Sequence, residues 1–132
     1  PTDLYERLVS PREKRLVDAI HAAGGLARLH ICGDTTHLLP GMAGTDVDII
    51  DLDWNVDMVH ARHVLGGAVT LAGNLNPVSD VLESAPEVIH SAFQSIYRSV
   101  GRPYMVNAGC EIPGATPHEN LRALCRPIPV DT

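Results

Sequence analysis

The sequence predicts an α/β fold of four parallel βα units, which is half of a (β/α)8 barrel. Extended apolar segments alternate with helical ones, and repeated βα units require a parallel sheet with right-handed crossovers. Polar residues end the extended segments, as they do on the catalytic face of such a barrel. A complete barrel needs eight strands and about 200 residues or more, whereas this chain has 132 residues.

The first predicted element is a helix over 12–23, because Leu16 and Ile20 belong to a set of apolar residues with helical spacing. Ser10 and Pro11 are expected to form its N-cap and first turn. Strands are predicted where apolar runs are bounded by glycine or polar turns. They are expected at 27–32, 47–53, 69–75 and 104–108.

The remaining helices are predicted from caps and stop signals. Asp34 is expected near the start of a short helix, and Gly101 closes the longest one. Thr116 begins a capping box before the last helix, which is expected to end at Cys125. These helices are expected at 35–42, 57–65, 77–82, 85–100 and 116–125.

Composition and charge exclude several classes of protein. The net charge is −6 at pH 7, whereas nucleic-acid binders normally carry a basic face. No segment approaches the ~18 apolar residues of a membrane span, and the N-terminal residues show no signal-peptide pattern. Three cysteines suit a reducing cytoplasm better than a disulfide scaffold. We therefore expect one cytoplasmic domain over 1–132, with no nucleic-acid or membrane partner.

Three soft metal ligands lie at the ends of two predicted strands. His30 and Cys32 are two residues apart, so a strand directs both to one side, and Cys110 follows the last strand. If the two strands share one sheet, the three can converge on one ion. Closed structural zinc sites use four protein ligands, so this set describes an open zinc site. The alternative is that both cysteines are core residues, since cysteine behaves as a small hydrophobe. Cys125 is expected to have no function.

Four other polar residues are candidate catalytic residues because they end or follow predicted strands. Asp51 and Asp53 share one strand face and are expected to orient a zinc-ligating histidine, contact substrate or cap the next helix. Asn74 either donates to a substrate or orders its turn. Glu111 is a candidate for the fourth coordination position when substrate is absent. Trp54 is expected to be a packing anchor rather than a cofactor platform.

Four ordered motifs carry a family resemblance. They stand at 30–34, 47–54, 73–77 and 107–113, the last followed by 116–120. Together they resemble the C-terminal half of the uroporphyrinogen decarboxylase superfamily. Gly109, Cys110 and Glu111 stand where the metal-free decarboxylases have a Gly-His-Gly turn. The chain therefore resembles more closely the zinc-dependent methylcobamide:coenzyme M branch of cobalamin methyltransferases.

This resemblance implies that His30, Cys32 and Cys110 bind zinc. It also implies a methyltransferase in which zinc deprotonates a small thiol, which then accepts a methyl group from a methylated corrinoid. The corrinoid, methylcobamide, would arrive on a partner protein. Two alternatives stay open: a metal-free decarboxylase acting on porphyrinogens, and a non-catalytic half barrel that serves as an assembly module.

The half barrel itself predicts two further properties. It lacks the other four strand-end loops, so we expect the isolated chain to be weakly active or inactive. Two unpaired sheet edges and an apolar inner face, which would pack against the other half of a barrel, predict a homo-oligomer.

Overall fold

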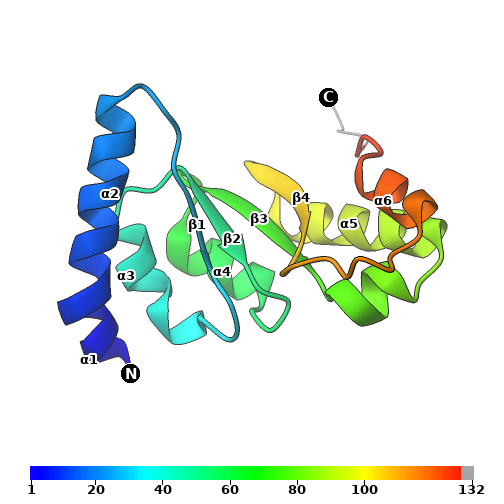
Figure 1. Cartoon of the computed structure of the whole chain (residues 1–132), viewed down its shortest axis with the longest axis horizontal. Coiled ribbons are helices and arrows are strands. Elements are labelled where there is room, and N and C mark those ends of the chain that lie inside the picture. The colour runs from blue at the N-terminus through cyan, green and yellow to red at the C-terminus, as the bar shows by residue number, and fades with distance from the viewer. Residues whose placement is uncertain (129–132) are drawn as a thin grey trace.

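A computed structural model describes residues 1–128 of the chain (Figure 1). Its centre is one four-stranded sheet in the order β1-β2-β3-β4, and every neighbouring pair is parallel. The strands are β1 (Arg28–Ile31), β2 (Ile49–Leu52), β3 (Thr70–Leu75) and β4 (Tyr104–Ala108). The predicted half barrel of four parallel βα units is confirmed, with strands that are the same or shorter at their ends.

Helices connect the strands and extend beyond both edges of the sheet (Figure 1). Short elements of π or 3-10 type are labelled η. The helical elements are α1 (Thr2–Leu4), η1 (Tyr5–Val9), α2 (Ser10–Ala22), η2 (Thr36–Leu38), α3 (Leu39–Ala43), α4 (Met58–Leu65), η3 (Pro77–Leu82), α5 (Pro86–Val100) and α6 (His118–Leu124).

The first helical region starts earlier than the sequence predicts. Ser10 was expected to be an N-cap, but α1 and η1 lead into α2 without a break, and Ser10 has helical dihedral angles. Proline is tolerated in a first turn because its nitrogen has no hydrogen to donate. The π-helical η1 ends at Val9, directly before α2, so the helical chain continues through a position that usually marks a helix start.

Two of the other helix starts are capped by side chains. Asp57 accepts hydrogen bonds from the backbone N–H groups of Val59 and His60, which fixes the start of α4 where the sequence predicts it. Asn76 caps η3 in the same way. The expected capping box at Thr116 is wrong, because α6 begins after Pro117 with no side-chain cap.

The two faces of the sheet differ in character. One face carries the apolar residues of the core, which pack against the helices; among these strand residues are Leu29, Ile31, Ile50, Leu52, Leu71 and Leu75. Alternation places Arg28, His30, Asp51 and Asn107 on the opposite face. The prediction of an apolar inner face is therefore wrong, because hydrogen-bonded polar side chains occupy its centre. No helix within 1–128 is both long and apolar enough to cross a membrane.

Candidate metal centre

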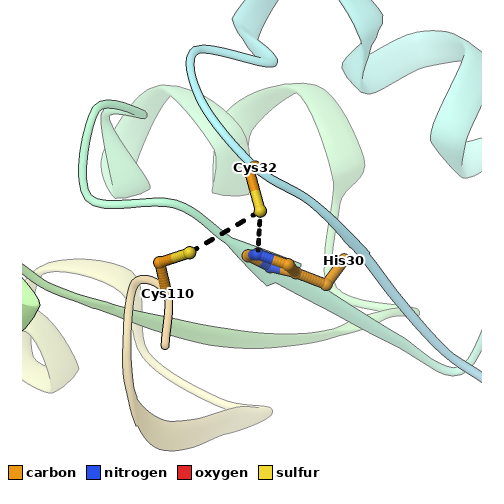
Figure 2. A group of neighbouring side chains, drawn as sticks. All are labelled: His30, Cys32 and Cys110. Atoms are coloured by element: carbon orange, nitrogen blue, oxygen red, sulfur yellow. Dashed lines mark hydrogen bonds between the residues drawn. The ribbon is translucent and has the colours of Figure 1, made fainter. Parts of the chain in front are cut away.

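Three side chains converge at the carboxyl ends of β1 and β4. The Sγ atom of Cys32 lies 3.3 Å from Nε2 of His30 and 3.6 Å from Sγ of Cys110. One ligand atom from each residue fits within 4.8 Å of the other two. Figure 2 shows the imidazole and both sulfur atoms directed at a common point. Cys32 is exposed and Cys110 half-buried, so the alternative that both are core residues is wrong.

This convergence joins the two edges of the sheet. In a flat sheet β1 and β4 would lie about 14 Å apart, since three strand spacings of about 4.8 Å separate them. The 3.6 Å distance between Cys32 and Cys110 therefore requires a sheet curled toward its polar face, as in part of a barrel. Both cysteines lie in the first turns after their strands, and the positive φ of Gly33 allows a sharp change of direction directly after Cys32.

The imidazole of His30 has a fixed orientation. Its Nδ1 lies 3.0 Å from the backbone oxygen of Asp51, which can only accept a hydrogen bond. Nδ1 therefore carries the proton, and Nε2 presents its lone pair toward the cysteines. Metal-ligating histidines commonly donate their second ring nitrogen in this way. Two thiols and one oriented imidazole are a donor set that zinc prefers, so the residues fit the ion.

Asp51 also organises the polar face through its carboxylate. Its side chain is only 7% exposed. Oδ2 accepts hydrogen bonds from Nε of Arg28 at 3.2 Å and from Nη2 at 2.6 Å, while Oδ1 accepts one from Asn107 at 3.1 Å. Sequence reasoning missed both partners. The signal for Arg28 was available, because it stands two residues before His30 and so shares its strand face.

Asp53 supports the turn that contains Cys32. Its Oδ2 accepts a hydrogen bond from the backbone N–H of Gly33 at 2.6 Å. Its Oδ1 is buried and has no hydrogen-bond partner within residues 1–128. The structure thus brings Asp53 beside the cluster, although a contact with substrate stays a prediction.

Asn74 lies near the end of β3, which is paired with both β2 and β4. Its Nδ2 donates to the backbone oxygens of Asp53, at 3.0 Å, and Val56, at 2.7 Å. This arrangement corresponds to the turn-ordering role that the sequence offered as one of two choices. A contact of Asn74 with substrate stays a prediction.

A hollow of about 370 Å³ opens beside the three ligands. It is lined by Arg28, His30, Cys32, Asp51, Asn107, Cys110 and Glu111. Glu111 is exposed on its wall, next to Cys110 in the chain. The hydrogen bond and charge of Cys110, followed by burial and the charge of Asp53, raise the pKa of the Cys32 thiol above its usual value. These neighbours thus favour the neutral form of the Cys32 thiol.

Gly109 fixes the position of Cys110 by close backbone packing. A Cβ atom on Gly109 would lie 2.3 Å from the backbone nitrogen of Trp54. The N–H of Gly109 also donates to the oxygen of Leu75 at 2.7 Å, which extends the β3–β4 pairing to the turn. Trp54 itself is 48% exposed, so its predicted role as a packing anchor is wrong. Cys125 is exposed and not part of the cluster.

Comparison with known proteins gives one family and two kinds of relative. The profile of the family described as Uroporphyrinogen decarboxylase (URO-D) matches residues 1–128. Methylcobamide:CoM methyltransferase MtbA of Methanosarcina mazei is 33% identical over 123 residues, which is 92% of this chain and 35% of the relative. Uroporphyrinogen decarboxylase of Koribacter versatilis is 32% identical over 123 residues, again 92% of this chain and 35% of the relative.

A solved structure confirms the fold. The chain superposes on a methyltransferase from Methanosarcina mazei with a TM-score of 0.84 at 22% identity, covering 94% of this chain and 36% of the other. The chain thus spans about a third of the length of the proteins it matches.

Proposed function

We propose that this chain, which belongs to the uroporphyrinogen decarboxylase family, carries the zinc site of a thiol methyltransferase. Relatives that the chain matches are enzymes by name, and they include both methyltransferases and decarboxylases. Identity to the two kinds is nearly equal, at 33% and 32%, so overall similarity does not choose between them. The choice depends on the site.

The observation that carries the proposal is the convergence of one imidazole and two thiols within 4.8 Å. His30, Cys32 and Cys110 would supply three ligands of a tetrahedral ion and leave the fourth position for a substrate. When bound, zinc would supply a Lewis acid that keeps a small thiol deprotonated at neutral pH. A metal-free decarboxylase, by contrast, gives no reason for this set of soft ligands.

The surrounding residues hold this arrangement in place. The carbonyl of Asp51 orients the ring of His30, and Asp53 holds the turn that begins at Gly33. The hollow beside the ligands leaves room for a small thiol. Glu111 on its wall is our candidate for the fourth ligand before substrate binds.

The other participants are inferred from the relatives. The name of the Methanosarcina enzyme gives a methylcobamide as methyl donor and CoM as acceptor. We propose that a corrinoid protein delivers the methyl group to this site. Because the chain covers 35% of that relative, we expect the isolated chain to transfer methyl groups weakly or not at all. We also propose that it forms a homo-oligomer.

Metal binding tests the proposal directly. The purified chain should bind about one zinc ion, measured by mass spectrometry of the metal after dialysis. Cys32→Ser and Cys110→Ser should each abolish binding, because two remaining ligands hold the ion poorly. The matched control is Cys125→Ser, which should keep full stoichiometry because Cys125 is outside the cluster. Zinc retained at full stoichiometry in the double variant of Cys32 and Cys110 would overturn the assignment.

Addition of methylcobalamin and a small thiol tests the chemistry. Slow methylation of the thiol that disappears with Cys110→Ser but not with Cys125→Ser would support the methyltransferase. Decarboxylation of a porphyrinogen by the zinc-free chain would support the rival activity. A chain with neither metal nor activity would indicate the non-catalytic module.

A further inference from the structure

We propose that Cys32 and Cys110 form a reversible disulfide under oxidising conditions, and that this bond closes the site to metal. The pairing itself rests on the placement of the two thiols. Its competition with zinc rests on the proposed function, because both sulfur atoms are ligands there. The inference makes this pair a site of redox modification, in addition to its role as candidate metal ligands.

The first support is the contact between the two sulfur atoms. They lie 3.6 Å apart, although the residues are 78 positions apart in the chain. Figure 2 shows the two thiols facing each other at the end of the sheet. A disulfide bond is about 2.05 Å long, so the sulfur atoms must approach each other by about 1.5 Å. The fold has therefore already brought together two thiols that are distant in sequence.

The second support is the setting of the two residues. Cys32 follows the last residue of β1, and Cys110 lies two residues after the end of β4. Neither belongs to a paired strand, so side-chain rotation and small shifts of the two turns can supply the remaining approach. Cys32 is exposed and Cys110 is half-buried, and both line the hollow of about 370 Å³. A small oxidant can therefore reach the pair.

Glutathione disulfide is a sufficient oxidant for this step. The thiolate of one cysteine attacks a glutathione sulfur, which forms a mixed disulfide and releases the first glutathione. The thiolate of the other cysteine attacks the protein sulfur of that mixed disulfide, which forms the bond between Cys32 and Cys110 and releases the second glutathione. The two released thiolates take up the two protons that the cysteines lose. The cysteines are thus oxidised by two electrons, and glutathione disulfide is reduced by two.

The disulfide and the metal compete for the same sulfur atoms. A metal binds the thiolate form of cysteine, and a disulfide holds no thiolate. After oxidation, His30 is the one candidate ligand that remains of the three. Bound zinc, in turn, occupies both sulfur atoms and prevents their oxidation. Disulfides in a reducing cytoplasm are usually transient and catalytic or redox-sensing, and a pair that opens and closes a metal site is of the sensing kind.

The Cys125→Ser chain, freed of metal with a chelator, tests the pairing because Cys32 and Cys110 are then its two cysteines. It is incubated with glutathione disulfide at about pH 8, where a larger fraction of each thiol is ionised. Mass spectrometry of the intact chain should show the loss of two hydrogen atoms and no glutathione adduct. Dithiothreitol should reverse the change, and the oxidised chain should bind no zinc. In the matched variant that also carries Cys32→Ser, Cys110 should keep a glutathione adduct.

The unaltered chain in urea provides a second measurement. In the folded chain, peptide mapping should find the disulfide between Cys32 and Cys110. In the unfolded chain, the entropy of loop closure favours the bond between Cys110 and Cys125, which are closer in sequence. The preferred pair should therefore change when the chain unfolds.

The outcomes separate this inference from the proposed function. Two thiols that stay free in the Cys125→Ser chain, two glutathione adducts on it, or the same pairing with and without urea would each overturn the disulfide. Free zinc at about ten times its dissociation constant should slow the oxidation about tenfold, because only the metal-free fraction reacts. Oxidation at an unchanged rate would mean that zinc does not bind these sulfur atoms. The proposed function would then fail while the disulfide stands.

Discussion

A side chain at position 109 would collide with the backbone of the loop that follows β2. A Cβ atom there would lie 2.3 Å from the nitrogen and 2.9 Å from the Cα of Trp54. Gly109→Ala should therefore push the turn away and displace Cys110. We expect the free energy of unfolding to fall by about 2–3 kcal/mol, as for an overpacked site. Urea denaturation measures the first effect, and a zinc titration measures the weaker metal binding.

The control for this variant is Gly67→Ala. An added Cβ at Gly67 meets no atom within 4 Å, so its effect on stability and zinc affinity should be small. Equal zinc affinity in Gly109→Ala and the wild type would mean that Cys110 does not depend on this contact.

Asp48 links the loop after α2 to the start of β2. Its Oδ2 accepts a hydrogen bond from the N–H of Ala27 at 2.7 Å and lies 2.8 Å from Nε2 of His21. These contacts, the backbone one first, lower the pKa of the Asp48 carboxyl in the folded chain. A lowered folded-state pKa stabilises the fold above the unfolded value of about 3.9, and this stabilisation is lost as the pH falls through the folded value.

Asp48→Asn keeps an oxygen acceptor but removes the charge. We expect the variant to be less stable than the wild type at pH 7, with the difference shrinking as the pH falls below about 4. Urea midpoints at a series of pH values measure this. Glu83→Gln, an exposed change of equal charge, is the control. A difference between Asp48→Asn and wild type that is constant from pH 7 to pH 2 would contradict the charge argument.

At the residue scale, the sequence predicts the direction of a side chain better than it predicts its hydrogen-bond partners. The spacing of His30 and Cys32 predicted a shared direction, and the structure brings them together. The spacing did not indicate that the backbone oxygen of Asp51 would accept the hydrogen bond from Nδ1 of His30. Hydrogen bonds to main-chain atoms depend on the relative placement of two strands, which local spacing does not encode.

At the scale of elements, the ends of β2 and β3 are joined by Asn74. Its amide donates to the oxygens of Asp53 and Val56 and so holds the loop after β2. Asn74→Ala removes both bonds, and we expect a loss of about 2 kcal/mol in the free energy of unfolding. Because Asp53 supports the turn of Cys32, zinc affinity should fall as well.

Asn55→Ala is the matched control for Asn74→Ala. Asn55 lies in the same loop but is exposed, and its side chain makes no hydrogen bond within the described part of the chain. Chemical denaturation and zinc titration of both variants measure the difference. Equal stability of the two variants would show that the loop does not depend on Asn74.

Helix boundaries can be predicted from the sequence where a local cap fixes them, and the prediction is wrong where no side chain caps the helix. Asp57 and Gly101 mark the start and end of their helices as predicted, because a carboxylate cap and a glycine with positive φ act locally. Pro11 lies in the first turn of α2 as predicted, but Ser10 is not the N-cap because the π-helical η1 leads directly into α2. The curl that brings the end of β1 close to the end of β4 could not be predicted from local sequence either. It results from the twist of the whole sheet, so the sequence predicted convergence of the three ligands only on the condition that both strands share one sheet.

At the scale of the whole molecule, the half barrel exposes more surface than a compact monomer. Its accessible surface is 7400 Å², whereas a folded monomer of this mass exposes about 6,800 Å². Both β1 and β4 are edge strands with unpaired backbone groups. Beside β4 lies a hollow of about 400 Å³ lined by Tyr97, Pro103, Tyr104 and Met105 among others. Met105 itself is 41% exposed.

We therefore expect the isolated chain to associate through the edge of the sheet at β4. Self-association there would pair backbone groups and bury Met105, with a total interface above ~2,000 Å² if the contact is obligate. Sedimentation velocity should then give at least twice the monomer mass of 14.2 kDa. Met105→Lys should shift the population to monomer, because a charge on an edge strand opposes pairing.

Val88→Lys is the matched control, because Val88 is 56% exposed on α5 and lies away from the strand edges. It should leave the sedimenting mass unchanged, since the same charge is then added outside the proposed interface. A monodisperse particle of 14.2 kDa for the wild type at tens of micromolar would contradict the prediction. The polar network of Arg28, Asp51 and Asn107 would then be sufficient to keep the open half barrel soluble as a single chain, without a partner on either edge.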